Sequence, residues 1–248
     1  MNRIWIGMVV VLLAWTQALA GEVRVAVASN FGAPMQKLVA QFEQISGHRV
    51  RLALGATGTF YAQIKNGAPF DVLLAADQET PARIEAEGLA VPSSRYTYAV
   101  GQLVLWSLQP GLVDERGEVL RHGNFRQLAL ANPRLSPYGR AAVQTLTSLG
   151  LWPALQARVV QGDNIAQAHQ FVMTGNAALG FVAWSQVNTD GKVKQGSFWR
   201  VPENLHAPIR QDAVLLRKGQ DNQAARELMD YLRSERAQTV IRSFGYGP

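Results

Sequence analysis

The sequence contains no cysteine among its 248 residues. Disulfide bonds, thiol catalysis and thiolate metal sites are therefore excluded together, and the folded chain depends on packing for its stability. Charge is also sparse, since only 17% of the residues are Asp, Glu, Lys or Arg. The basic residues are scattered and never form a run of about five or six, which argues against a nucleic-acid partner. The net charge of +6 is explained by solubility.

Motifs of the common enzyme and metal-site classes are missing as well. The chain has no Gly-x-Ser-x-Gly elbow and no His-Glu-x-x-His helix. Its four histidines lack the spacing of metal ligands, and they are His48, His122, His169 and His206. His169 falls on an apolar helical stripe and is predicted to be packed there. We therefore predict that the chain is not an enzyme and that it has no cofactor and no bound metal cation.

The N-terminal segment has the pattern of a cleaved secretory signal. Arg3 precedes an apolar stretch over residues 4–15, and Ala18-Leu19-Ala20 precedes Gly21. This stretch is shorter than the roughly 20 residues that a spanning helix needs, and the small-x-small ending suits signal peptidase. We predict that residues 1–20 are a signal peptide and that the mature protein is soluble and exported. Its length allows one large domain or two lobes.

The chain after this signal begins with a strand that leads into a helix. Valines alternate with smaller or polar residues over residues 23–27, which predicts a strand. Apolar residues then recur at helical spacing over residues 32–46, so the period changes at Ser29-Asn30. The first N–H groups of a helix have no internal acceptor and carry the positive end of its dipole, which suits an anion. The alternative is an ordinary helix cap, because Ser and Asn also satisfy such groups.

The same succession of strand, donor-rich loop and helix recurs three times, with loops at residues 55–59, 132–138 and 162–165. The glycines of the first of these loops allow backbone N–H groups to approach a ligand, and its threonines add hydroxyl donors. It is not a phosphate-binding P-loop, because no Lys follows its second Gly. The alternative is a glycine turn with Thr59 as the helix cap. After the second of these loops, a helix is predicted over residues 140–149.

Strands that alternate with helices predict a mostly parallel sheet with helices on both faces. The β-rich segment over residues 96–107 is longer than a usual strand, and we predict that it passes from one lobe to the other. Segments 198–201 and 209–216 are candidates for the return. In open α/β sheets ligands bind beyond the carboxyl ends of the strands, so two junctions from each lobe are expected to face one cleft. Asp71 and Asp77 are given structural roles, since helix capping explains Asp77.

Several motifs occur in a fixed order along the chain, namely Val-Ala-Ser-Asn-Phe, Gly-Ala-Thr-Gly-Thr-Phe-Tyr-Ala-Gln-Ile, Asn-Gly-Ala-Pro-Phe-Asp-Val-Leu-Leu-Ala-Ala-Asp-Gln, Asn-Pro-x4-Tyr-Gly-Arg-Ala-Ala and Ala-Leu-Gly-Phe-Val-Ala. With these motifs the whole mature chain resembles the periplasmic molybdate-binding proteins, the soluble receptors of bacterial ABC importers. The resemblance implies an α/β fold of the two-lobed type II periplasmic binding protein class, each lobe a mostly parallel sheet flanked by helices. It assigns residues 21–101 and 205–248 to the first lobe and 102–204 to the second.

The resemblance also implies a ligand site. Position by position, it makes Ser29 and Asn30 a first pair of ligand donors, Thr57 a hydroxyl donor, Tyr138 a contact from the second lobe and Ile165 a backbone N–H donor. It further implies molybdate or tungstate as the ligand, a periplasmic location, a membrane permease and its ATPase as partners, and a monomer. This chain is similar to the family variant with Asn and Tyr at positions 30 and 138. The other variant has Ser and Ala there, and a Tyr where this chain has Ala183.

Other functions stay open on the residues alone. Within the binding class, the alternative is a receptor for sulfate or another tetrahedral oxyanion. A different class is an exported hydrolase or transferase on an α/β scaffold, against which the missing catalytic motifs argue. A third is an exported structural module that binds no anion.

Overall fold

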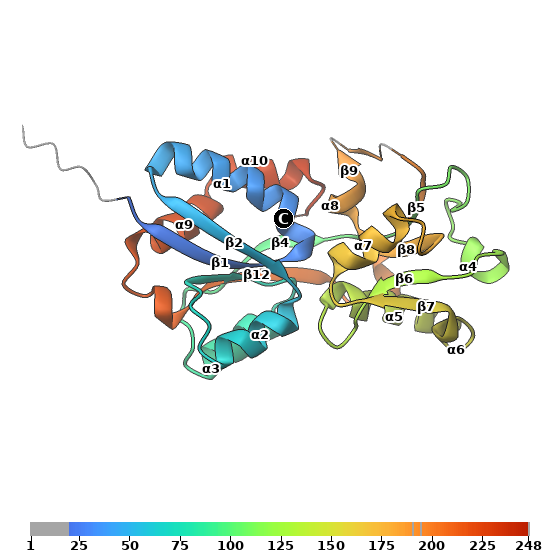
Figure 1. Ribbon diagram of the computed structural model, residues 1–248, viewed down its shortest axis with the longest axis horizontal. Helices are drawn as coiled ribbons and strands as arrows, with labels where there is room; N and C mark the ends of the chain where they lie inside the picture. Colours follow the sequence, from blue (N-terminus) through green and yellow to red (C-terminus); the bar gives the residue numbers. More distant parts are fainter. Residues whose placement is uncertain (1–19, 190, 194, 248) are drawn as a thin grey trace, which may run out of the picture.

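The computed structural model describes residues 20–189, 191–193 and 195–247, and it consists of two lobes that lie side by side (Figure 1). The predicted signal peptide, residues 1–20, lies outside the described residues except for Ala20. Each lobe contains one five-stranded sheet. The predicted two-lobed α/β architecture is therefore confirmed. Among the described residues, no helix has the length and apolar character that crossing a membrane requires.

The first lobe has the strand order β2-β1-β3-β12-β4. Its strands are β1 (Glu22–Ala28), β2 (Arg49–Gly55), β3 (Val72–Leu74), β4 (Tyr96–Gly101) and β12 (Ile209–Leu215). Strands β1, β2 and β3 pair in parallel, whereas β12 is antiparallel to both of its neighbours. The helices of this lobe are α1 (Gly32–Ser46), α2 (Thr57–Lys65), α3 (Glu79–Ala86), α9 (Gln223–Arg233) and α10 (Glu235–Ser243), with short 3-10 helices η1 (Ser29–Phe31) and η4 (Arg217–Gly219).

The second lobe repeats this plan with the strand order β11-β5-β8-β6-β7. Its strands are β5 (Leu103–Ser107), β6 (Leu128–Ala131), β7 (Val159–Gly162), β8 (Leu179–Ala183) and β11 (Ser197–Arg200), and a small hairpin joins β9 (Asn188–Thr189) to β10 (Lys192–Val193). Only β5 among the five runs against the others. The helices are α4 (Val119–His122), α5 (Pro137–Ser148), α6 (Trp152–Leu155), α7 (Ile165–Met173) and α8 (Trp184–Val187), with 3-10 helices η2 (Gln156–Arg158) and η3 (Glu203–Leu205).

Each sheet is mostly parallel by strand direction, as predicted, with a single antiparallel strand. That strand is in both cases a product of the crossing between lobes. The predicted long segment divides into β4 and β5 on either side of Gln102, and the return divides into β11 and β12. The chain leaves each sheet at the edge that faces the other lobe, so the strand that enters the next sheet, β5 on the first crossing and β12 on the return, runs against its neighbours.

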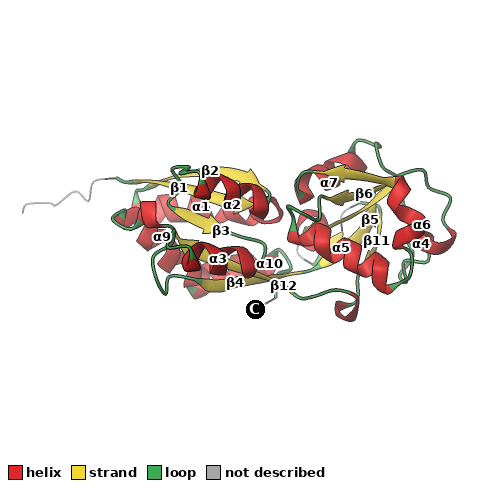
Figure 2. Ribbon diagram, turned by 90° about the horizontal axis from the view of Figure 1, so that it is seen from below, coloured by secondary structure: helices red, strands yellow, loops and turns green. Residues whose placement is uncertain are grey.

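The alternating sequence of β1 explains how helices cover both faces of the first sheet. Val23, Val25 and Val27 pack with α1, α9 and α10, whereas Ala26 points to the opposite face and packs with Phe60 of α2. In Figure 1, α1 and α10 lie above this sheet and α2 and α3 below it, and Figure 2 views the lobe from the side of α2 and α3. Helix α1 ends as the sequence suggests, because Gly47 takes the left-handed conformation at a φ of 74°.

One predicted boundary is wrong, and it concerns the site. Helix α5 was expected to start at residue 140, but it begins at Pro137. Ser136 caps the helix by accepting a hydrogen bond from the backbone N–H of Gly139, and proline is favoured at the first helical position. Tyr138 therefore lies in the first turn of the helix and not in the loop before it.

Candidate functional site

The carboxyl ends of neighbouring strands bring the predicted loops together at one edge of each sheet. Ala28 at the end of β1 pairs with Gly55 at the end of β2, so Ser29 and Thr57 follow adjacent strand ends. In the second lobe, Ala131 of β6 pairs with Gly162 of β7 in the same way. The two edges face each other between the lobes (Figure 1). The expectation that two junctions from each lobe meet at one place is confirmed.

Direct hydrogen bonds join the two edges. The Ser29 hydroxyl donates to Asn164 Oδ1 at 3.2 Å and accepts from the Ala166 N–H at 3.4 Å. The N–H of Gly58 in α2 donates to the carbonyl oxygen of Leu135 in the second lobe at 2.9 Å. The lobes are thus in contact at the loops that carry these donors.

The five predicted site residues share a position within their helices. Each lies in the first turn of a helix, namely Ser29 and Asn30 in η1, Thr57 in α2, Tyr138 in α5 and Ile165 in α7. Backbone N–H groups in a first turn lack an acceptor within the helix. Four helix starts therefore direct N–H groups and the positive ends of their dipoles into the region between the lobes.

The side chains of the predicted site residues contribute fewer hydrogen-bond donors to this region than the sequence suggested, and Thr57 is the exception. Thr57 is buried, and its Oγ1 accepts a hydrogen bond from the Ala76 N–H at 3.0 Å. Its own hydroxyl hydrogen therefore stays free to donate to a second partner. Helix capping does not explain Ser29 or Thr57, since neither side chain caps its own helix. The cap of α7 is Asn164, which accepts from Ala166 and Gln167.

Asn30 and Tyr138 direct their side chains into a hydrogen-bonded cluster behind the helix starts. Asn30 Nδ2 donates to Gln211 Oε1 and to the Tyr246 hydroxyl, each at 2.9 Å. Gln211 Nε2 donates to the Tyr138 hydroxyl at 3.1 Å. The side chains of Asn30 and Tyr138 are therefore engaged within the protein, and their backbone N–H groups belong to the first turns of η1 and α5.

We refer to this cluster as the buried network, and its members are Asn30, Tyr98, Tyr138, Ser185, Gln211 and Tyr246. All six are buried and none carries a charge at neutral pH. Burial raises the pKa of Tyr98 and of Tyr138 well above the ordinary value, and it raises the pKa of Tyr246 to about 12. The phenols consequently stay protonated over the physiological range.

Sequence reasoning missed four of these six residues. Arg210, Gln211 and Asp212 interrupt the apolar residues of a segment predicted to be a strand, and polar residues that a strand buries need buried partners. That interruption was the available signal for Gln211. Tyr98, Ser185 and Tyr246 give no comparable signal, because they are single polar groups in segments far apart in the sequence.

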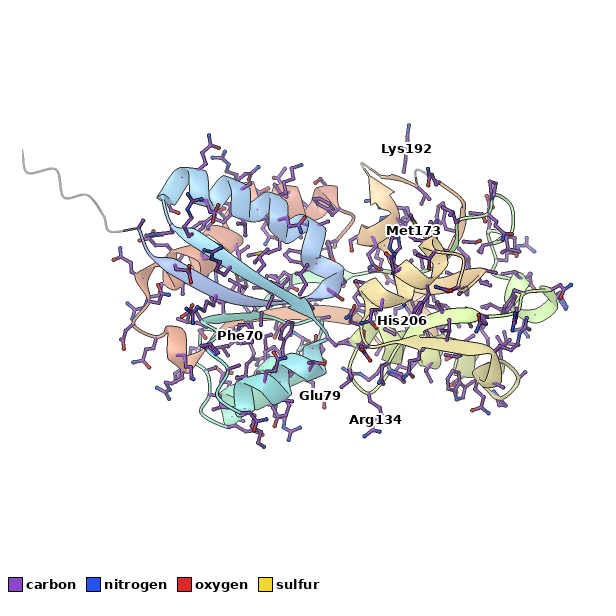
Figure 3. All side chains as sticks on the ribbon, in the orientation of Figure 1. Phe70, Glu79, Arg134, Met173, Lys192 and His206 are labelled. Atoms are coloured by element: carbon purple, nitrogen blue, oxygen red, sulfur yellow. The ribbon has the colours of Figure 1, made fainter. Side chains whose placement is uncertain are left out.

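Charged residues gather instead at the rim of the region between the lobes. Arg140 Nη2 of α5 lies 2.7 Å from Asp77 Oδ2, and we call these two residues the rim pair. Asp77 Oδ1 also accepts a hydrogen bond from the Thr80 N–H in the first turn of α3, which fits the predicted capping role although Gln78 is the N-cap residue. Its pairing across the lobes was not foreseen. Glu79 and Arg134, labelled in Figure 3, line a cavity of about 220 Å³ beside the pair. Within the described part of the chain, no charged side chain hydrogen-bonds any of the five predicted site residues.

Two further predictions can be placed. His169 stacks on Trp106 with ring centroids 5.2 Å apart, and burial lowers its pKa, so it is packed as expected. Ala183 ends β8 fully buried in the core of the second lobe. Within the described residues, the acidic and histidine side chains form no group of three or more suited to a metal ion.

Comparison with known proteins agrees with this architecture. The family model described as bacterial extracellular solute-binding protein matches residues 23–247. The chain is similar to the molybdate-binding protein ModA of Azotobacter vinelandii, with 58% identity over 93% of this chain and 91% of that protein. It is 47% identical to the ModA protein of Rhodobacter capsulatus, over 92% of this chain and 89% of that protein.

The same likeness holds in three dimensions. A solved structure of an A. vinelandii periplasmic molybdate-binding protein superimposes with a TM-score of 0.87 at 40% identity. The match covers 91% of this chain and 99% of that one. Both the sequence and the structural relatives extend over nearly the whole chain. The chain belongs to the family of bacterial extracellular solute-binding proteins.

Proposed function

We propose that this protein captures molybdate between its two lobes in the periplasm and delivers it to an ABC importer. The observation that carries the proposal is the convergence of four helix starts on one region between the lobes. The ModA proteins to which the chain is similar are named for the same ligand.

Neutral donors suit this ligand for a physical reason. Molybdate is a tetrahedral dianion whose oxygens only accept hydrogen bonds. A hydrogen bond to an ionised acceptor contributes about 1.5–3 kcal/mol, so several such bonds hold the dianion without a countercharge. A protonated phosphate brings an O–H group that finds no acceptor among N–H donors, and the site therefore selects against it.

The donors that we assign are specific atoms of the five predicted residues. Ser29, Asn30, Tyr138 and Ile165 contribute backbone N–H groups, and Thr57 contributes its N–H and its hydroxyl. The positions of these residues in the first turns of their helices support this assignment. The Ser29 hydroxyl, which bonds Asn164 across the lobes, is placed to rotate toward the ligand. We extend the assignment to tungstate, which has the same charge and shape.

The organisation of the protein follows from the same proposal. We assign residues 21–101 and 205–248 to the first lobe and residues 102–204 to the second. Cleavage after Ala20 releases the mature protein, which acts as a monomer and is not an enzyme. The membership of the two sheets supports these boundaries. A membrane permease and its ATPase are the partners that receive the ligand.

Calorimetric titration of residues 21–248 with molybdate, tungstate, sulfate and phosphate tests the function. We expect one-to-one binding of molybdate and tungstate, with negligible heat from sulfate and phosphate. Equally tight sulfate binding would keep the oxyanion site and replace the assigned ligand. Absence of binding heat with all four anions would refute the proposal, and the five residues would then have structural roles only.

Closure of the lobes on the ligand is the second consequence. The hydrogen bonds between the lobes run from the ligand loops themselves, so separation of the lobes opens the site. Small-angle scattering should show a smaller radius of gyration after molybdate is added. An unchanged radius would contradict closure.

A further inference from the structure

Gln211 is a point in the buried network where a single side chain joins the ligand loops of both lobes. Its Oε1 accepts from Asn30 Nδ2 at 2.9 Å, and its Nε2 donates to the Tyr138 hydroxyl at 3.1 Å. Asn30 follows β1 in the first lobe, and Tyr138 begins α5 in the second. The side chain of Gln211 is fully buried and lies on β12, the strand that returns from the second lobe.

The chemistry of an amide suits this bridge. An amide presents an acceptor and a donor at fixed separation, so it accepts from the first lobe and donates to the second. The Tyr98 hydroxyl lies 3.0 Å from both Gln211 Oε1 and the Ala75 carbonyl oxygen, and its single hydrogen is shared between these two acceptors. A buried amide left without its partners is costly, so the bridge favours the arrangement in which both loops are present.

The crossing between the lobes is shaped to bring this bridge together. Gly101 ends β4 directly before the chain enters the second lobe. A Cβ at this position would overlap the Tyr138 hydroxyl and come within 2.5 Å of Gln211 Nε2. Glycine therefore allows the crossing backbone to lie against the bridge. Because Gln211 belongs to one lobe and Tyr138 to the other, their hydrogen bond joins the two lobes directly beside the crossing.

We propose that Gln211 is a positioning residue that couples anion capture to closure, by holding the Asn30 loop of the first lobe against the Tyr138 helix start of the second. The inference rests on the proposed function and deepens it. Gln211 itself does not touch the anion. It acts by fixing two helix starts whose N–H groups do.

The test compares variants of the mature protein in molybdate titrations. Gln211→Met keeps the length and volume of the side chain and removes both hydrogen-bonding atoms; we expect binding to weaken 10-fold or more. Tyr138→Phe removes only the hydroxyl that accepts from Gln211 and keeps the backbone N–H; we expect a weakening of about fivefold. The double variant should be no weaker than Gln211→Met alone, because both changes break the same bridge.

A pH profile separates positioning from simple packing. Gln211→Glu keeps the shape but replaces the donor with a group that ionises beside the dianion. The titratable groups that face position 211 are the phenols of Tyr98 and Tyr138, and the neighbouring Asp212 is paired with Arg95 at 2.8 Å. The affinity of this variant should fall at least 10-fold from pH 6 to pH 9, while the affinity of the wild type stays constant.

The matched control is Gln238→Met, because Gln238 hydrogen-bonds only the Tyr98 and Leu232 carbonyls of its own lobe. It should bind like the wild type. Wild-type affinity in both Gln211→Met and Tyr138→Phe would overturn the inference, even if their melting temperatures fell. Tyr138→Phe keeps the test decisive if the Gln211 variants do not fold. Absence of molybdate binding by the wild type would instead refute the proposed function.

Discussion

Two of the regions through which the lobes contact each other differ in their chemistry. The buried network is neutral and enclosed, and it runs directly behind the helix starts that face the proposed ligand. The rim pair is charged and partly open to solvent, with the Asp77 and Arg140 side chains 12% and 39% exposed. Both regions join the same two lobes. Variants in the two regions therefore compare the effect of buried neutral contacts on ligand binding with that of exposed ionic contacts.

This difference indicates where charge is tolerated near the proposed dianion site. A carboxylate beside the ligand would repel it, and an unpaired cation would trap any anion that arrives. The buried network joins the lobes through neutral groups, so it neither repels the ligand nor attracts other anions. At the rim, Asp77 is neutralised by Arg140, and water screens what remains. We therefore expect changes in the network to act on affinity strongly and changes at the rim to act weakly.

The largest effect is expected from Gly101→Ala, which pushes a methyl group into the network. Overpacking of a buried site costs about 1–3 kcal/mol, and here the clash falls on the contact between the lobes. Molybdate binding should weaken about 100-fold, measured by calorimetry. The control is Gly247→Ala, whose added Cβ would stand in ordinary contact 3.5 Å from Val100. Equal affinities for the two variants would contradict this reading of the crossing.

A weakening of 10- to 100-fold is expected from Thr57→Val, which removes the proposed hydroxyl donor and keeps the shape. The matched control is Thr145→Val, since Thr145 is equally buried and bonds the Ala141 carbonyl of its own helix. Titration of both variants with molybdate is the measurement. If Thr57→Val binds as tightly as the control, Thr57 is not part of the site.

A smaller effect, about fivefold or less, is expected from Arg140→Gln. Partly exposed ion pairs contribute up to about 1 kcal/mol, so molybdate should dissociate slightly faster and associate at an unchanged rate. Stopped-flow kinetics at low salt measure both rates, and high salt should abolish the difference. Arg83→Gln serves as the control, because Arg83 pairs with Glu87 inside the first lobe at 3.0 Å. A loss as large as that of Thr57→Val would refute the proposed contrast.

Between pH 6 and pH 9 no change in affinity is expected, because the network stays protonated there. Above pH 10 stability should fall. The pKa of Tyr246 rises from 10.0 to about 12 on folding, so the unfolded chain loses this proton first and deprotonation favours unfolding. The loss is about 1.4 kcal/mol for each pH unit between these two values. Thermal melts from pH 8 to pH 12 test this, and Tyr246→Phe should flatten the decline.

The sequence predicted the elements and the loops because both leave local signals. The change of period at Ser29-Asn30 and the glycines of residues 55–59 are visible within a few residues, and the strand-end rule then places them at one edge. The start of α5 was misplaced because Ser136-Pro137, a cap followed by a favoured first residue, was read as loop. A closer reading of that dipeptide would have placed Tyr138 in the helix.

The contacts of the buried network and of the rim pair could not be predicted from the sequence, for a different reason. Asn30 and Gln211 are 181 residues apart, and Asp77 and Arg140 are 63 apart, so no periodicity links them. Their meeting depends on how the two lobes sit against each other. Only the three-dimensional arrangement shows that the phenol of Tyr138 bonds Gln211 of the crossing strand, which supports our assignment of its backbone N–H to the ligand.

The most direct test of the central claim is a crystal structure with tungstate, located by the anomalous scattering of tungsten. We predict one strong peak between the lobes, with oxygens at hydrogen-bond distance from Thr57 Oγ1 and from the backbone N–H groups of Asn30, Tyr138 and Ile165, and with no Lys or Arg side chain in contact. A peak held by Arg140 or Arg134 at the rim would contradict the account, since a countercharge and not the neutral helix starts would then bind the anion.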